Sequence, residues 1–150
     1  TSSMVVSGND VYVGGQCFYD PDKSLPGYWK NGTWFGLTSL PTSGNSDVGS
    51  GSVDSLVVSE GDIFAAGFLY NSSGISSTGY WKNGTWVELS PPSPSTNLWF
   101  VYSLVVSGKD IYAAGYNINS IPGYWKNGAW VSLKPPSELG NSRIVSLFVH

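Results

Sequence analysis

The chain contains the same block of sequence three times. Each copy has Ser-Leu/Met-Val-Val-Ser, then Asp-Val/Ile-Tyr/Phe, then Gly-Tyr-Trp-Lys-Asn-Gly, always in this order. The aspartates that begin the second segment, Asp10, Asp62 and Asp110, lie 52 and 48 residues apart. A period of this length is typical of architectures in which one supersecondary unit packs against the next. We therefore expect a single repeat array. Its units are predicted at residues 1–40, 53–90 and 101–134, with the start of a fourth at 144–150.

Each unit is predicted to hold four short antiparallel strands. A tight Ser-x-x-Asp turn joins the first two, and β-branched and aromatic residues follow it, as is usual for strands. The segment Trp-Lys-Asn-Gly-Thr-Trp indicates a hairpin, because Asn-Gly tolerates the positive φ angles of a type I′ turn. A two-residue loop here places Trp29 opposite Trp34 on one face of the sheet. Six tryptophans repeat in this way and are predicted to pack between units: Trp29, Trp34, Trp81, Trp86, Trp125 and Trp130.

The first two strands of a unit are apolar on both faces, as in the runs 56–58 and 63–66. A strand with one face in water would alternate apolar and polar residues, so both faces must be covered. A four-stranded sheet of about 50 residues that is repeated and covered on both sides favours a blade of a β-propeller. A β-solenoid could also bury both faces, but its parallel pairing is at odds with the Asn-Gly hairpin.

The predicted fold class is all-β, because no window shows helical spacing of apolar residues. The expected architecture is a partial, propeller-like array of three four-stranded antiparallel blades and one extra strand. Three blades do not close a ring, since propellers have four or more.

The repeat resembles a known kind of protein. Ser-Gly-x-Asp-Val-Tyr-Val followed by Tyr-Trp-Lys-Asn-Gly-Thr is similar to the tandem repeats of secreted or surface-anchored bacterial proteins, over nearly the whole chain. In architecture the chain is also similar to propeller lectins of the tachylectin type. These resemblances imply a secreted or cell-surface location, and they supply no catalytic residue.

Composition excludes several functions. With 7 Lys+Arg against 10 Asp+Glu, the net charge of -3 offers no cationic stripe for phosphates, so nucleic acid is not an expected partner. No apolar run is long enough to cross a bilayer, so no transmembrane segment is expected. The 15% of aromatic residues argues against a disordered chain, which lacks such apolar surface.

Catalysis finds little support in the sequence. The single histidine is His150, the last residue, so a Ser-His-Asp triad or a His-rich metal site is not expected. Cys17 lacks a local base and is more simply a small buried hydrophobe. Asp20 and Asp22 do not complete a calcium loop. A carboxylate-pair glycosidase is conceivable, yet no pair stands out among Asp47, Asp54, Glu60, Glu88 and Glu138. We therefore predict no enzyme, no cofactor and no metal.

The repeated aspartates beside the tight turns allow two interpretations. They could form a ring of carboxylates or metal ligands, or each carboxylate could accept backbone N–H bonds within its own turn. The fixed position beside a turn favours the structural role. The residues predicted to have this structural turn role are Asp10, Asp62, Asp110, Asn31, Asn83 and Asn127.

The opposite end of the array is predicted to carry recognition. Up-and-down strands bring the variable connections to that end, namely 16–26, 68–78 and 116–122 within units and 38–52, 90–98 and 134–142 between them. Binding residues are often found on such loops. Trp99, which lies outside the repeated pairs, could stack on a sugar there, although core packing is the favoured interpretation. The other candidate ligand-binding residues are Tyr70, Asn71, Asn45, Asp47, Asn117 and Asn119.

Two functions follow as hypotheses. The first is a non-catalytic extracellular module that recognises a glycan or a surface protein. The alternative is a structural subunit that assembles into a ring or filament without a small ligand. In either case the open ends of a partial propeller require cover from a second copy of the chain or from further blades.

Overall fold

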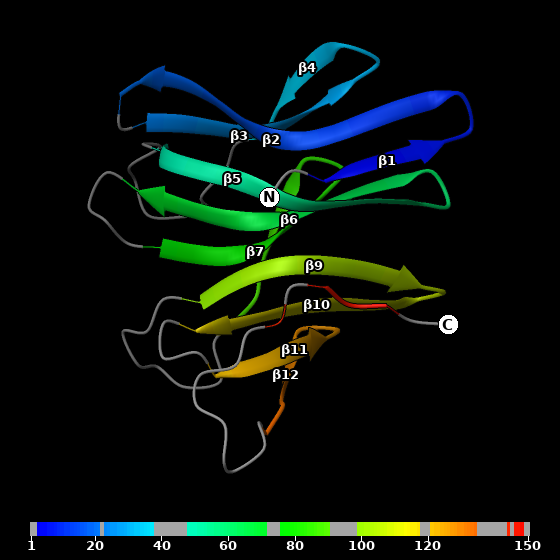
Figure 1. Ribbon diagram of the computed structural model, residues 1–150, viewed down its shortest axis with the longest axis vertical. Helices are drawn as coiled ribbons and strands as arrows, with labels where there is room; N and C mark the ends of the chain where they lie inside the picture. The colour runs from blue at the N-terminus through cyan, green and yellow to red at the C-terminus, as the bar shows by residue number, and fades with distance from the viewer. Residues whose placement is uncertain are drawn as a thin grey trace.

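The computed structural model is all-β over the residues it describes and consists of three sheets stacked along its long axis (Figure 1). The described residues are 3–21, 23–37, 48–71, 76–90, 99–117, 121–134, 144 and 146–148. Blade one contains β1 (Met4–Ser7), β2 (Asp10–Asp20), β3 (Lys23–Lys30) and β4 (Thr33–Gly36). Blade two contains β5 (Val48–Ser59), β6 (Asp62–Asn71), β7 (Ser76–Lys82) and β8 (Thr85–Glu88). Blade three contains β9 (Trp99–Ser107), β10 (Asp110–Asn117), β11 (Pro122–Lys126) and β12 (Ala129–Ser132). In every blade the four strands pair antiparallel in chain order.

The Asn-Gly hairpins adopt the backbone that their sequence requires. Asn31 and Gly32 have φ angles of 50° and 82°, and the other two Asn-Gly pairs lie within two degrees of these values. Positive φ at both central residues defines a type I′ turn, whose twist matches that of the strands. The register then pairs Trp29 with Trp34, and their ring centroids are 4.4 Å apart.

A glycine beside this hairpin makes room for the tryptophan. A Cβ atom on Gly79 would lie 2.8 Å from Cζ2 of Trp86 and would also meet the carbonyl oxygen of Val87. Gly27 and Gly123 stand in the same relation to their own tryptophans. The Gly-Tyr-Trp sequence of each unit is thus explained by packing within one blade.

Neighbouring blades pack through two different faces. Val5, Tyr12 and Tyr28 of blade one lie against Leu56, Trp81 and Trp86 of blade two in one apolar cluster. We call these the Tyr face and the Trp face of a blade. Blade two repeats the arrangement, because its Tyr face packs against the Trp face of blade three in a second cluster. The second cluster contains Val57, Phe64 and Tyr80 from blade two and Leu104, Trp125 and Trp130 from blade three.

A serine hydroxyl also links each blade to the next. The Leu56 N–H donates to Ser3 Oγ at 3.1 Å, and the Leu104 N–H donates to Ser55 Oγ at 3.0 Å. Because β5 and β9 are edge strands, half of their N–H groups point away from the sheet, and the serine satisfies one of them.

The described part of the fourth unit extends this pattern. The Leu147 N–H donates to Ser103 Oγ at 2.9 Å, so Ser146, Leu147 and Phe148 lie where a next blade would begin (Figure 1). These three residues stand outside the twelve strands. The fold is therefore a partial propeller of three blades followed by the first segment of a fourth.

The strands are longer than the sequence suggests. The predicted connection 16–26 is mostly the outer part of β2 and β3, whose ladder continues to the pair Asp20–Lys23. Blade two begins at Val48 rather than at residue 53, and blade three begins at Trp99 rather than at 101. The cause is that β5 and β9 each contain a bulge, beside Gly67 and Gly115, which lets pairing continue past the glycines.

Candidate functional site

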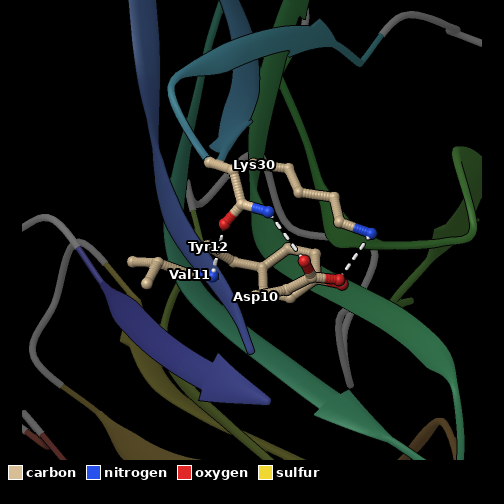
Figure 2. Close-up of polar contacts among 5 residues, drawn as sticks. Asp10, Val11, Tyr12 and Lys30 are labelled. Atoms are coloured by element: carbon tan, nitrogen blue, oxygen red, sulfur yellow. Dashed lines mark hydrogen bonds and ion pairs between the residues drawn. The ribbon is translucent and has the colours of Figure 1, made fainter. Parts of the chain in front are cut away.

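Each Asn-Gly turn is tied to the Ser-x-x-Asp turn of its own blade. Asn31 Oδ1 accepts the Val11 N–H at 2.9 Å, and Asn31 Nδ2 donates to Asp10 Oδ1 at 2.7 Å. The Lys30 ammonium lies 2.8 Å from Asp10 Oδ2 and 5.2 Å from the centre of the Tyr12 ring. We call Asp10, Lys30 and Asn31 the Asp-Lys-Asn cluster, and Figure 2 shows its Asp10 carboxylate facing the end of Lys30. The Tyr12 hydroxyl also donates to Asp10 Oδ2 at 3.4 Å, so the partners of the carboxylate are side chains of the hairpin and of its own strand.

The same cluster occurs in all three blades. It consists of Asp62, Lys82 and Asn83 in blade two and of Asp110, Lys126 and Asn127 in blade three. The prediction that each aspartate accepts backbone N–H bonds of its own turn is wrong in its detail. The tight turn leaves the carboxylate directed at the hairpin, where an asparagine and a lysine bind it.

These contacts lower the pKa of the aspartates. Hydrogen bonds from Lys30 and then Asn31 hold the pKa of Asp10 below its ordinary value, and the contact with Asp10 raises the pKa of Lys30. Asn83 and Lys82 lower the pKa of Asp62, as Asn127 and Lys126 lower that of Asp110. Each carboxylate is ionised and paired inside its own blade. This arrangement suits a brace between two turns and provides no free base.

A shallow groove of about 290 Å³ lies between blades two and three at this end of the molecule. Phe64, Val106 and Ile111 form its apolar floor, and Glu60 and Lys109 lie among the residues at its rim. Asp62 and Lys82 also line it, but they bind each other at 2.9 Å. The groove therefore follows from the packing of two blades around a paired cluster.

Trp99 is not available to a ligand. It is 7% exposed, and its ring makes edge contacts with Trp125 at 5.8 Å and Trp130 at 4.7 Å between centroids. Its ladder partner is Asn117, whereas the corresponding pair in blade two is Gly51 and the buried Leu69. In blade two the large side chain of this pair, Leu69, is on the second strand, and in blade three it is Trp99 on the first strand. Either arrangement fills the space between the blades. Assigning Trp99 to a binding site is contradicted by its burial.

The remaining predicted ligand-binding residues are only partly placed. Tyr70 is half-buried near the end of β6. Asn71 and Asn117 are the last residues of β6 and β10, at the end of the array that was predicted to carry recognition. Asn45, Asp47 and Asn119 lie outside the described residues.

Tyr70 belongs to a cluster of aromatic side chains that bridges blades two and three. Phe68 contacts Tyr70 at 5.2 Å and Phe100 at 6.5 Å between ring centroids. Phe100 in turn lies 6.2 Å from Tyr116, which stacks on Tyr102 at 5.0 Å with the rings 13° from parallel. All five rings are half-buried, so each keeps part of its surface in water. This aromatic cluster is the candidate binding site.

Polar groups lie beside these rings. In the ladder Tyr70 is opposite Ser50 and Ser76, and Phe68 is opposite Ser52. The Ser52 hydroxyl donates to the carboxylate of Asp54 at 3.4 Å. Asp54 is half-buried, and the loss of solvent around it raises its pKa above the ordinary value. The site thus combines flat apolar surfaces with hydroxyl groups and a carboxylate.

Sequence reasoning missed four members of this cluster, which are Phe68, Phe100, Tyr102 and Tyr116. The available signal was a difference between the repeats. Gln16 takes the position of Phe68 and Tyr116 in blade one, while Ser52 takes that of Phe100 in blade two. Aromatic residues that are absent from some copies cannot be needed for every blade, and such positions are the better candidates for recognition.

The residues considered for catalysis are dispersed. Among the described residues there is no group of three or more His, Cys, Asp or Glu side chains that could hold a metal ion. Cys17 is a free, half-buried thiol on β2. Asp54, Glu60 and Glu88 lie on different strands or turns of blade two. Asp47, Glu138 and His150 fall outside the described residues, and so does Asp22. The described part of the chain holds no helix that could cross a membrane.

Comparisons with known proteins identify no family for this chain. No protein-family model matches the chain, and no curated protein is found to match it. One solved structure that is similar is a fucose lectin from Kordia zhangzhouensis in complex with methyl-fucoside, at 14% sequence identity and a TM-score of 0.49. The match covers 88% of this chain and 96% of the lectin. A superposition this loose does not carry a conclusion about the ligand of this chain.

Proposed function

We propose that the chain is a non-catalytic recognition module, secreted or displayed on the cell surface, that binds a glycan through the aromatic cluster on blades two and three. The observation that supports it is the set of five half-buried rings joined across a blade boundary. The location rests on the resemblance of the repeat to secreted and surface-anchored bacterial proteins.

The chemistry of the cluster suits a sugar. Pyranose rings have apolar C–H faces that pack on aromatic rings, and hydroxyl groups that need hydrogen-bond partners. The stacked pair Tyr102 and Tyr116 provides a flat surface with phenolic oxygens at its edge, where the Tyr116 hydroxyl donates to that of Tyr102 at 3.2 Å. Ser52 and Asp54 add a hydroxyl and a carboxylate beside Phe68. A protein loop rich in aromatic and polar residues could use the same surface and is the other ligand class to test.

A glycan array probed with the 150-residue chain tests the proposal, followed by calorimetric titration of each glycan that binds. We expect Tyr70→Ala and Phe100→Ala to weaken binding at least tenfold, since each removes a ring from the surface. Phe35→Ala is the matched control, because Phe35 is an exposed ring that stacks on Tyr28 in blade one, away from the cluster. An absence of binding to every glycan would reject the proposal. The proposal would also be rejected if the control Phe35→Ala weakened glycan binding as much as Tyr70→Ala and Phe100→Ala do.

The alternative function, structural self-assembly, is favoured by a different observation. The Trp face of blade one is open to solvent, whereas the Trp faces of the other two blades are covered. An assembly role would need no ligand at the aromatic cluster. The open face belongs to blade one, whereas the aromatic cluster belongs to blades two and three.

A further inference from the structure

Blade one exposes a face that the other blades bury. Met4 and Val6 are 69% and 62% exposed, while Leu56 and Leu104, which hold the position of Met4 in the next two blades, are 4% and 3% exposed. Trp29 is half-buried, whereas Trp81 and Trp125 at the same repeat position are fully buried. Among the described residues, a neighbouring blade covers the Trp faces of blades two and three, and none covers that of blade one.

From Met4 to Leu25, the described residues of the open Trp face include no charged side chain, and Lys23 lies beyond its far end. Met4 pairs with Val13, and Val13 pairs with Trp29, which is opposite Trp34. Cross-strand partners share a face, so the residues that continue it by alternation are Val6, Val11, Cys17 and Leu25. An uninterrupted apolar surface of four strands exceeds what a soluble monomer usually presents to water. Such a surface marks a site of association.

The complement of this face is present on blade three. In both internal contacts a valine and two aromatic rings of the Tyr face cover the next Trp face, and the rings keep one geometry. Tyr12 and Tyr28 are 6.2 Å apart with 45° between their planes, and Phe64 and Tyr80 are 6.3 Å apart with 44°. Tyr112 and Tyr124 of blade three are 6.4 Å apart with 45°. Blade three therefore presents a preformed copy of the surface that covers a Trp face.

The segment around Leu147 occupies part of that surface. Its N–H is bonded to Ser103 Oγ in the same way as Leu56 is bonded to Ser3 and Leu104 to Ser55. Met4 is the residue of blade one that aligns with these leucines. A blade that docks on blade three would thus bring Met4 to the place that Leu147 now holds.

We propose that the Trp face of blade one binds the Tyr face of blade three in a second copy of the chain, with Met4 displacing Leu147 from Ser103. The contact is head-to-tail, so the two copies use different surfaces and the association can continue to a ring or a filament. The segment 146–148 competes with the incoming copy. This association does not depend on the proposed glycan site.

Sedimentation velocity over a range of protein concentrations tests the proposal. We expect the wild-type chain to associate with rising concentration, and the double variant Met4→Lys, Val6→Lys to remain monomeric, because it places two charges in the contact. Val105→Lys on the Tyr face of blade three should have the same effect, since Val105 corresponds to Val5 and Val57. Val87→Lys is the control, as Val87 is an exposed valine on the outer strand of blade two. Circular dichroism checks folding, and Tyr124→Lys replaces Val105→Lys if that variant does not fold.

Mixing separates head-to-tail association from a symmetric contact. The Met4, Val6 double variant keeps an intact Tyr face, and the Val105→Lys variant keeps an intact Trp face. An equimolar mixture should therefore form heterodimers, although neither variant associates alone. Association of the Val105→Lys variant by itself would indicate a symmetric pairing of Trp faces and overturn the proposal, and a mixture that stays monomeric would overturn it too. A wild-type chain that is monomeric at every concentration, or a control that dissociates as the variants do, would overturn it as well.

A further variant tests the competition by residues 146–148. Leu147→Pro removes the N–H that Ser103 accepts, so the segment loses its anchor. We expect association to become tighter by about fivefold, the equivalent of one ordinary hydrogen bond. Unchanged or weaker association would contradict the displacement of Leu147.

Discussion

The bond from Leu104 to Ser55 offers a measurable test of how the blades are held together. Ser55 and Leu104 are both buried, so Ser55→Ala leaves a buried N–H without its acceptor. Such a loss costs about 1–3 kcal/mol of folding free energy. For a chain of this size the melting temperature changes by roughly 2–4 °C per kcal/mol, so a fall of about 2–12 °C is expected. Thermal and urea unfolding, followed by circular dichroism, measure it.

The repeat supplies an internal comparison. Ser103→Ala removes the same kind of bond, but its donor Leu147 is half-buried, and water can reach the released N–H. The cost should therefore be under about 1 kcal/mol, as for an ordinary exposed hydrogen bond. If the two variants lost equal free energy of unfolding, burial of the N–H donor would not determine how much stability the bond contributes. If Ser55→Ala left the free energy of unfolding unchanged, the serine would not contribute to holding one blade against the next.

Three further predictions follow. Gly79→Ala should destabilise the chain by about 1–3 kcal/mol in urea unfolding, because its Cβ would strike Trp86 and a neighbouring carbonyl; unchanged stability would show that the hairpin can move aside. Stability should fall as the pH drops through about 3.9 and lower, because the folded-state pKa values of Asp10, Asp62 and Asp110 are depressed and the unfolded chain binds protons first; unfolding curves between pH 2 and 7 check it. The contribution of Asp54 to stability changes with pH in the opposite direction. Its raised pKa makes the folded state take up the proton first, so Asp54→Asn should remove a gain in stability on moderate acidification and leave the loss at lower pH intact.

The repeat made most of the fold predictable. The type I′ turns, the opposed tryptophans and the antiparallel order in each blade follow from the Asn-Gly pair and its fixed distance from two tryptophans. These features are local and occur three times, so a single interpretation had to satisfy all copies. The lengths of the strands were not predictable in this way. The bulges beside Gly67 and Gly115 continue the ladder into sequence that reads as loop.

The candidate site was harder to predict because its residues come from different blades. Tyr70 was singled out as a polar aromatic residue at the variable end. Its neighbour Phe68 contacts Phe100, which is 32 residues away in sequence, only because two blades pack. Core packing was the favoured interpretation of Trp99, and its burial agrees, but the sequence did not show the cause. Its burial depends on the exchange of a large side chain between β9 and β10, which is visible only once Gly51 and Leu69 are seen as partners in the equivalent ladder.

A general rule for this array emerges from comparing the copies. Residues that recur in every blade serve contacts that recur, as Ser55 and Trp81 do, and their loss should affect folding. Aromatic residues that occur in only some copies, such as Phe100 and Tyr102, are not needed to build a blade and remain half-exposed. Met4 combines features of both groups. It occupies a position that recurs in every blade, yet its side chain is exposed. A recurring residue without its recurring contact is the clearest sign that blade one has a binding partner, and the Tyr face of blade three is the surface whose geometry matches it.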